Sequence, residues 1–229
     1  MSLPPIIEQM LSPEFYDHPV TKPIQLLQTH ISFILLTGSY AYKVKKPMNF
    51  GFLDFSTLEK RKYFCEEELR LNRRLAPELY LSVLSIVETD GKYRFDQTGT
   101  GLPVEYAILM PEFPQDDLLI EMFASGRLTA DHVKQIGEQL AAFHQQAATN
   151  DYINTFGTAE AVRAVANDNY ASTEKYIGIA QTEEQLAQTR TYTENFFAEN
   201  ADLFSDRIAK GKVRECHGDV HLKNICLYQ

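Results

Sequence analysis

The sequence has no tryptophan, only three cysteines and no long apolar run. A membrane helix needs about 20 consecutive apolar residues, so no membrane partner is expected. Cys65, Cys216 and Cys226 lack the paired spacing of a disulfide framework. The N-terminus lacks the basic start and apolar core of a signal peptide. These absences together favour a cytoplasmic protein.

Positive charge is also scarce, because 22 Lys and Arg stand against 31 Asp and Glu, for a net charge of −9. A broad nucleic-acid-binding face needs a basic surface, so no nucleic-acid partner is expected. The remaining composition is ordinary for a folded protein, with 44% hydrophobic and 23% charged residues. A chain of 229 residues can bury a sizeable core.

Two glycine-rich phosphate-binding motifs are missing. The P-loop pattern G-x-x-x-x-G-K-[ST] does not occur in the chain. The pattern G-x-G-x-x-G is also absent between the first two expected strands, where Thr29-His-Ile-Ser stands instead. A phosphate at that turn is therefore expected to meet backbone amides and the hydroxyls of Thr29 and Ser32.

The first half of the chain has the patterns of a small antiparallel sheet. Apolar or alternating runs between turn residues predict strands, and Thr89-Asp-Gly is a hairpin signal. The expected elements are a helix over 5–11, a three-stranded meander within 24–45, strands over 80–88 and 92–96, and a strand over 104–110.

One further helix is expected within this half. The Ser-Thr pair at 56–57 can cap it, and Pro77 stops it, so we expect it to end near Leu75. Phe64, Leu71 and Leu75 are spaced for one helix face.

The second half of the chain is helical in composition. It is expected to contain a helix that opens at Leu128-Thr-Ala-Asp, helices over 158–176 and 182–208, and short strands over 212–216 and 225–228. Strands that precede helices indicate an α+β protein. We expect two lobes, 1–112 with the antiparallel sheet and 113–229 with the helices.

The residues that carry chemistry lie in one loop near the end, Cys216-His-Gly-Asp-Val-His-Leu-Lys-Asn. An Asp can orient a substrate hydroxyl and accept its proton, and an Asn side-chain oxygen can ligate Mg²⁺ beside the phosphates. Asp219 and Asn224 are the candidates for these roles, and Lys223 can add positive charge. The pattern favours phosphoryl transfer.

His217-Gly-Asp-Val-His-Leu-Lys-Asn resembles the H-G-D-x-H-x-x-N loop of the aminoglycoside phosphotransferase-like kinases, which include choline-type and other small-molecule kinases. The protein-kinase loop has Arg where Gly218 stands and a longer spacing to its Asn. The resemblance implies a two-lobed protein kinase-like fold, ATP and Mg²⁺ as cofactors, and a small-molecule hydroxyl as acceptor. It assigns Asp219 as catalytic base and Asn224 as metal ligand, with His217 and His221 in support.

The resemblance extends to the first half of the chain. Tyr40-Ala-Tyr-Lys resembles the Val-Ala-Ile-Lys strand and places Lys43 on the phosphates, with Lys45 on the same strand face as the alternative. Glu68 resembles the helix glutamate that holds this lysine, while the neighbouring 66–67 pair of glutamates stays open. Met110-Pro-Glu-Phe resembles the hinge, so Met110, Glu112 and Phe113 are expected to meet adenine.

The run from Thr29 to Asn-Arg-Arg-Leu-Ala-Pro-Glu-Leu-Tyr resembles a poorly characterised bacterial branch whose kinase-like domain is often followed by a P-loop ATPase domain. An ATPase domain is therefore an expected partner. Kinases carry a second metal ligand, an Asp, on the strand after the catalytic loop, and this position would lie past residue 229. We therefore expect a truncated chain with weak or no turnover. The alternative is a catalytically silent nucleotide-binding module that regulates an ATPase.

Two plainer interpretations of the same residues stay open. The lysines at 43, 45 and 46 also fit a solvated strand face. Several side chains around the loop are of types that bind zinc: Cys216, His217, Asp219, His221 and Cys226. Zinc is less favoured, because there is no Cys-x-x-Cys pair and Gly218 interrupts the two histidines.

Overall fold

The computed structural model describes residues 2–51 and 53–228 and has an α+β architecture. The chain divides into two compact units, of which one comprises the residues up to Leu128 together with those from Asp219 onward. The other comprises Thr129–Gly218. The α+β class expected from the sequence is confirmed, and each unit is described below by itself.

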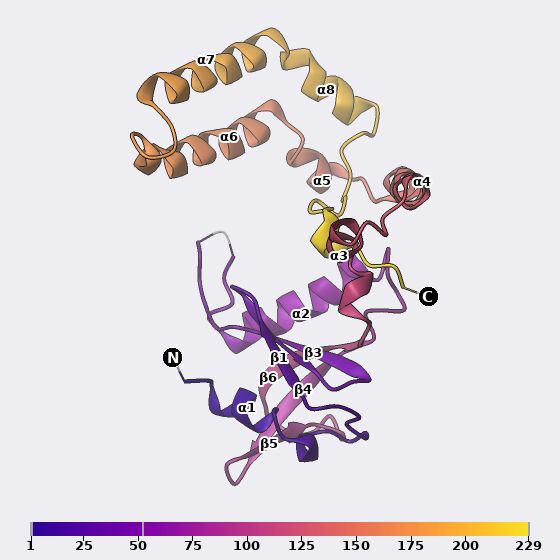
Figure 1. Cartoon of the computed structure of the whole chain (residues 1–229). Helices are drawn as coiled ribbons and strands as arrows, with labels where there is room; N and C mark the ends of the chain where they lie inside the picture. The colour runs from indigo at the N-terminus through magenta and orange to yellow at the C-terminus, as the bar shows by residue number, and fades with distance from the viewer. Residues whose placement is uncertain (1, 52, 229) are drawn as a thin grey trace. The chain divides into compact units, whose positions relative to one another are not determined.

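The first unit contains the six strands and most of the short helices (Figure 1). Its elements are α1 (Pro5–Gln9), η1 (Pro13–Phe15), β1 (Gln25–Gln28), β2 (Ser32–Leu36), β3 (Tyr40–Lys45), α2 (Leu58–Asn72), β4 (Ser82–Thr89), β5 (Lys92–Phe95), β6 (Pro103–Pro111), η2 (Gln115–Asp117), α3 (Leu119–Ala124) and η4 (Leu222–Asn224). The second unit consists of α4 (Ala130–Gln146), α5 (Asp151–Thr155), α6 (Ala159–Thr173), η3 (Glu174–Tyr176), α7 (Glu183–Glu199) and α8 (Ala201–Ala209).

The strands form one antiparallel sheet in the order β1-β2-β3-β6-β4-β5. The expected meander is confirmed as β1 to β3, and the expected hairpin is confirmed as β4 and β5. Asp90 and Gly91 join that hairpin with φ values of 51° and 77°, which is the left-handed backbone that a two-residue hairpin turn requires. The sequence patterns do not predict that β6 inserts between β3 and β4.

The two faces of the sheet are covered differently. The N-terminal segment covers one face, where Ile7, Met10, Phe15 and Tyr16 pack with strand residues in the main hydrophobic core. Helix α2 covers the other face and contacts β6 and β4 (Figure 1). Helix α2 lies on the face of the sheet that carries Lys43, and there the Lys43 ammonium donates to Glu68 of α2 at 2.7 Å.

Helix α2 begins as expected but differs in its length and in its buried face. Thr57 caps it, since the Thr57 hydroxyl accepts from the N–H of Lys60 at 3.3 Å. The helix ends at Asn72, so Leu75 lies beyond it and is exposed. The buried residues of α2 are Arg61 and Cys65 rather than the expected apolar face.

An ion pair explains the buried arginine. The Arg61 Nε lies 2.9 Å from both carboxylate oxygens of Glu105 on β6, and Arg61 also donates to the carbonyl of Phe55 at 3.1 Å. A charged side chain is tolerated in such a place only when it is paired and hydrogen-bonded. Apolar spacing therefore misidentified the helix face, because paired charges occupy positions that such spacing reserves for apolar residues.

The second unit follows the sequence patterns in part. Helix α4 begins at Ala130, two residues after Leu128, with a capping box formed by Thr129 and His132. The helix expected over 158–176 ends its α-helical part at Thr173. The helix expected over 182–208 is interrupted at Asn200, which has φ −122° and ψ 28° and so cannot continue α7. The short helices α3 and α5 were not expected.

Two expected strands are corrected by the structure. Residues 212–216 form no strand, because they lie along the end of α4 rather than beside a strand. There Glu215 donates its N–H to the Ala148 carbonyl at 2.9 Å and Arg214 donates to the Ala147 carbonyl at 2.8 Å. Of the strand expected over 225–228, only a single bridge between Cys226 and Leu118 is present.

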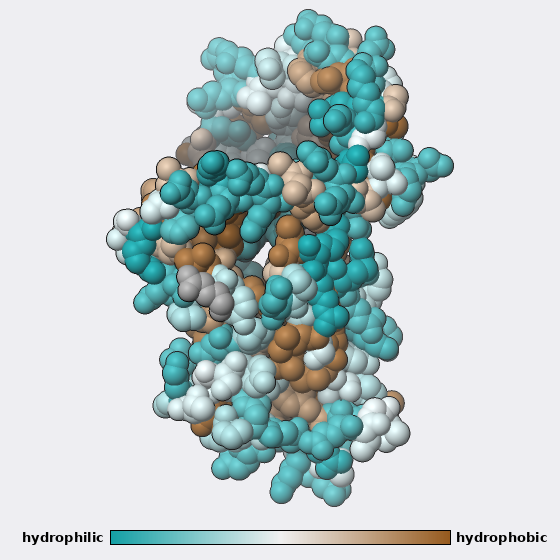
Figure 2. Space-filling model, turned by 90° about the vertical axis from the view of Figure 1, so that its right-hand side faces the viewer, coloured by the Kyte–Doolittle hydropathy of each residue, from teal (hydrophilic) through white to brown (hydrophobic). Residues whose placement is uncertain are grey.

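Apolar side chains are exposed in several places. Figure 2 shows brown apolar areas among the teal polar side chains. In the second unit, Tyr152, Val165, Ile179 and Tyr192 are each more than half exposed, at 71%, 62%, 80% and 72%. No helix among the described residues is long and apolar enough to cross a membrane.

Replacing Gly38 by alanine is expected to destabilise the first unit more than replacing Gly91. Both glycines have positive φ, 92° and 77°, which costs a side chain about 1 kcal/mol. A Cβ at Gly38 would also lie 2.3 Å from Thr21 Oγ1, whereas a Cβ at Gly91 meets nothing within 4 Å. Urea denaturation of Gly38→Ala and of the control Gly91→Ala measures the difference. Equal losses of unfolding free energy would show that the Thr21 contact does not restrict position 38.

Candidate functional site

Two lysines of β3 share one glutamate of α2. Lys43 Nζ lies 2.7 Å from Glu68 Oε1, and Lys45 Nζ lies 2.5 Å from Glu68 Oε2. The Lys45 side chain is only 4% exposed, while that of Lys43 is 24% exposed. The structure therefore brings Lys43 and Glu68 together and adds Lys45 to the same cluster.

Local geometry explains this selection. Lys43 and Lys45 are two residues apart on β3, so their side chains leave the strand on the same face. Successive residues of α2 differ in direction by about 100°, so only one of the three neighbouring glutamates can face β3. Glu68 faces the lysines, whereas Glu66 lies 3.8 Å from Lys62 and Glu67 lies 2.9 Å from Arg70.

The charges of the cluster control its protonation. Burial alone raises the pKa of Glu68, but the charges and hydrogen bonds of Lys43 and Lys45 outweigh burial and lower this pKa overall. Burial raises the pKa of the neighbouring Cys65 thiol to about 12. Lys45 Nζ also lies 4.7 Å from the ring centre of Phe55, a favourable cation–π position. Glu68 is therefore a carboxylate and Cys65 a neutral thiol at neutral pH.

Tyr80 follows α2 and belongs to the same compact unit as this cluster. Burial is the first cause that raises the pKa of Tyr80, followed by the nearby charges of Glu68 and Cys226. The segment that follows the candidate catalytic loop also belongs to the same compact unit as the lysine–glutamate cluster.

The candidate catalytic loop is closed by the side chain of Asn224. Asn224 Nδ2 donates to Asp219 Oδ2 at 2.9 Å and to the Asp219 carbonyl at 3.0 Å. His221 Nε2 lies 3.1 Å from Asn224 Nδ2 and 3.6 Å from Asp219 Oδ1, and His221 Nδ1 accepts from the N–H of Lys223 at 3.2 Å. The loop therefore brings Asp219, His221 and Asn224 together on an exposed surface.

Backbone hydrogen bonds attach this loop to the first unit. Leu119 donates its N–H to the Ile225 carbonyl at 2.9 Å, and Leu227 donates to the Asp117 carbonyl at 2.8 Å. In Figure 1 the loop, in yellow, lies against α3, and contacts between α3 and η4 agree. His217, by contrast, lies at the end of the second unit and is half-buried there.

In the expected hinge, Met110 and Glu112 are engaged in contacts within the protein. Met110 belongs to β6, where it is paired with Ala41 of β3. The Glu112 N–H donates to the Ser39 carbonyl at 2.9 Å, and Glu112 Oε2 accepts from the Gly38 N–H at 2.7 Å. Among the described residues, the N–H of Phe113 meets no acceptor. Among the three residues of the expected hinge, Phe113 therefore has the backbone donor that can meet a ligand.

The turn between β1 and β2 does not offer the phosphate contacts that its sequence suggests. Thr29 Oγ1 accepts from the N–H groups of Ile31 at 3.3 Å and Ser32 at 2.9 Å. The Thr29 N–H itself donates to the Ser32 carbonyl at 2.9 Å. The Ser32 hydroxyl is fully buried and, among the described residues, has no hydrogen-bond partner. The amides of Thr29, Ile31 and Ser32 are thus occupied within the turn.

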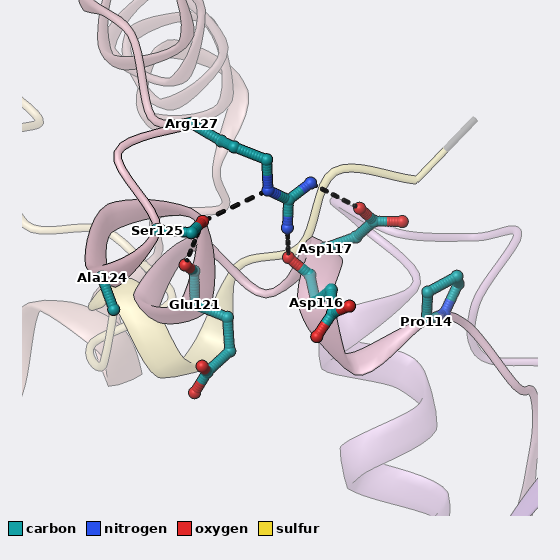
Figure 3. Close-up of a pocket in the computed structure, with 7 residues that line it drawn as sticks. All are labelled: Pro114, Asp116, Asp117, Glu121, Ala124, Ser125 and Arg127. Carbon is teal, nitrogen blue, oxygen red and sulfur yellow. Dashed lines mark hydrogen bonds and ion pairs between the residues drawn. The ribbon is translucent and has the colours of Figure 1, made fainter.

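A pocket that the sequence did not indicate lies just after the expected hinge (Figure 3). Arg127 donates to Asp117 Oδ1 at 3.4 Å, to Ser125 Oγ at 3.2 Å and to the carbonyl of Asp116. Glu121 and Asp116 also line the pocket. Three carboxylates against one guanidinium make the pocket acidic, so it suits a cationic group better than a phosphate. No local motif predicts this pocket, because Arg127 reaches back ten residues.

No three or more His, Cys, Asp and Glu side chains within 2–51 and 53–228 are grouped so that they could hold a metal ion. The zinc alternative for Cys216, His217 and their neighbours therefore has no support from the geometry. A magnesium ion that is held partly by nucleotide phosphates needs fewer protein ligands, and the oxygens of Asp219 and Asn224 are of the type it prefers.

Comparisons with known proteins provide relatives but no family. No family model matches the chain, and no solved structure matches it. The chain is 29% identical over 212 residues to proteins of Mycobacterium tuberculosis and Mycobacterium bovis that are described as uncharacterized. The match covers 92% of this chain and 41% of each relative. The chain therefore spans about two fifths of the length of these curated relatives.

Glu68→Gln is expected to destabilise the protein by about 3 kcal/mol, because it leaves two mostly buried lysines without a counter-charge. The folded pKa of Glu68 lies below its ordinary value of 4.5. The carboxylate therefore contributes stability that is fully present above the unfolded pKa and is lost as pH falls through the folded pKa. Urea denaturation between pH 7 and pH 3 measures both effects.

The control is Glu66→Gln, because Glu66 is exposed and only loosely paired with Lys62. This variant should retain both the stability of the wild type and its decline with acid. If the unfolding free energy of Glu68→Gln fell between pH 7 and pH 3 as steeply as that of the wild type, the acid sensitivity would have to arise from other groups.

Proposed function

We propose that the protein is an ATP-dependent phosphotransferase that acts on the hydroxyl of a small molecule and has a two-lobed protein kinase-like fold. One observation carries the proposal. The ion pair of Lys43 with Glu68, at 2.7 Å, and the closed loop of Asp219 with Asn224, at 2.9 Å, belong to one compact unit. Phosphoryl transfer needs these two parts together, a cation on the phosphates and a carboxylate at the acceptor.

Lys43 is the group for the phosphates. Its ammonium carries three N–H donors, and among the described residues its partner is Glu68. The remaining donors can bind phosphate oxygens, and the 24% exposure of the side chain gives a ligand access. The unbonded N–H of Phe113 supports binding of a purine edge beside β6.

Asp219 is the group for the acceptor. Its carboxylate is fixed by the Asn224 amide nitrogen, so the side chain is oriented before substrate arrives. Asp219 accepts the proton of the acceptor hydroxyl while that oxygen bonds to the terminal phosphorus and the bond from phosphorus to ADP breaks. His221 holds the loop through its contacts with Asn224 and Lys223.

Asn224 is suited to hold the magnesium ion that accompanies ATP. Its amide nitrogen faces Asp219, and among the described residues its Oδ1 accepts no hydrogen bond. An amide oxygen beside a carboxylate matches the oxygen ligands of Mg²⁺. The bound ion would supply positive charge next to the phosphates.

A second candidate is a nucleotide-binding module without turnover that acts together with an ATPase domain. The β1–β2 turn favours it, because Thr29 occupies the amides of Ile31 and Ser32. Phosphates would then be held by Lys43 alone on this side. A cytoplasmic location fits both candidates.

Asp219→Asn is expected to lower transfer of the ATP γ-phosphate by about 10²–10⁴-fold while ATP affinity stays within about threefold, because the carboxylate acts as base rather than as nucleotide ligand. ADP release is measured with Mg²⁺-ATP and a panel of hydroxyl compounds. The assay uses residues 1–229 and the complete product of the gene, because the curated relatives are longer.

Asp206→Asn is the matched control, since Asp206 is an exposed carboxylate on α8 paired with Lys210 at 2.8 Å. Wild-type turnover in Asp219→Asn would exclude Asp219 as the base. Tight ATP binding with no turnover in any form of the wild type would favour the second candidate.

Asn224→Ala is expected to raise the Mg²⁺ concentration needed for half-maximal turnover by about tenfold or more, because a metal ligand is lost. A magnesium titration at fixed ATP measures this, and removal of Mg²⁺ with a chelator should abolish turnover. An unchanged magnesium requirement in this variant would assign the metal to other residues.

A further inference from the structure

We infer that Lys45 is a positioning residue for phosphate binding. By sharing Glu68, it leaves Lys43 with positive charge that no group among the described residues neutralises. The inference rests on the proposed function, because it assumes that Lys43 meets a polyphosphate. The sequence offers Lys43 and Lys45 as alternatives for one role, whereas this inference gives each lysine a role of its own.

Burial separates the two lysines. The Lys45 side chain is 4% exposed and is held between Glu68 and the ring of Phe55, at 2.5 Å and 4.7 Å. The Lys43 side chain is 24% exposed. A ligand in solution can therefore reach Lys43 but not Lys45, and Lys45 must act through Glu68.

The charges around the cluster do not cancel. Lys43 and Lys45 bring two positive charges and Glu68 brings one negative charge. Nearby on α2 and β6, Arg61 and Glu105 neutralise one another at 2.9 Å.

Two further titratable groups, the Cys65 thiol and the Tyr80 phenol, are neutral. Burial raises the pKa of the Cys65 thiol to about 12 and also raises that of the Tyr80 phenol. The cluster therefore keeps one uncompensated positive charge, in partly buried surroundings where an opposite charge is attracted more strongly than in water.

Hydrogen-bond geometry leads to the same result. Lys45 occupies Glu68 Oε2, so Lys43 is held by Oε1 alone. A glutamate that faced a single lysine could turn both oxygens toward it and hold more of its donors. With Lys45 in place, Lys43 is fixed by one bond and keeps its other donors for phosphate oxygens.

Replacement of Lys45 by methionine distinguishes a role in phosphate binding from a purely structural role, which would appear as a loss of stability. Replacement of Lys45 by methionine leaves Lys43 and Glu68 as a balanced pair and places an apolar chain against Phe55. Exchange of a buried charge for an apolar side chain is often neutral for folding when no partner is left unpaired. If Lys45 serves phosphate binding, the loss should appear in affinity for charged ligands rather than in stability.

The test measures binding of Mg²⁺-ATP, ADP and adenosine to the wild type and to Lys45→Met by isothermal titration calorimetry at two salt concentrations. We expect Lys45→Met to weaken Mg²⁺-ATP about tenfold and to leave adenosine within about twofold, with a smaller salt dependence than the wild type. Lys45→Arg, which keeps the charge, should restore ATP affinity to within about threefold. Lys62→Met is the control, because Lys62 lies on the exposed side of α2.

The outcomes distinguish this inference from the proposed function. If the wild type binds Mg²⁺-ATP and Lys45→Met binds it equally well, the inference fails and the proposed function stands. If the wild type binds neither Mg²⁺-ATP nor ADP, both fail. Should Lys45→Met not fold, Lys45→Gln carries the same expectation. Equal losses of affinity for adenosine and for Mg²⁺-ATP would show that Lys45 serves the fold alone and would overturn the inference. Unfolding of both Lys45→Met and Lys45→Gln would overturn it in the same way.

Discussion

The carboxylate of Glu68 between Lys43 and Lys45 is the interaction on which the rest of the candidate site depends. It joins α2 to a central strand of the sheet at 2.7 Å and 2.5 Å. A buried carboxylate needs compensation, so the two lysines fix both the rotation of α2 and its position along β3. The Arg61–Glu105 pair adds a second fixed point between α2 and β6. Three ion pairs at two points, rather than an apolar stripe, thus determine how this helix lies on the sheet.

Local patterns predicted the strands well, and long-range pairing limited the rest. The meander and the Asp90-Gly91 hairpin depend on residues that are adjacent in the sequence, so their patterns contain the needed information. The position of β6 beside β3 depends on pairing between residues 63 to 71 positions apart, which no local pattern encodes. The strand expected over 212–216 was wrong because its donors bind carbonyls at the end of α4.

The candidate site shows the same division. The spacing from Asp219 to Asn224 is local, and the structure places the two side chains 2.9 Å apart. The choice among three consecutive glutamates required the orientation of α2 on the sheet, which only tertiary packing supplies. The internal use of Glu112 could not be foreseen, because its carboxylate caps a turn at Gly38, 74 residues earlier. Sequence reasoning therefore found the residue types of the site but not which of their atoms stay available.

The missing glycine-rich turn and the second lysine are physically related under the proposed function. A phosphate can be held by backbone amides or by cationic side chains. Thr29 occupies the amides of Ile31 and Ser32, so the β1–β2 turn in this conformation contributes little to binding a phosphate. Cationic side chains must then bind the phosphate more strongly. A single lysine whose charge is neutralised by Glu68 would bind it less strongly. Lys45 offsets this weakness, because it binds one carboxylate oxygen of Glu68 and so leaves part of the Lys43 charge available to the ligand.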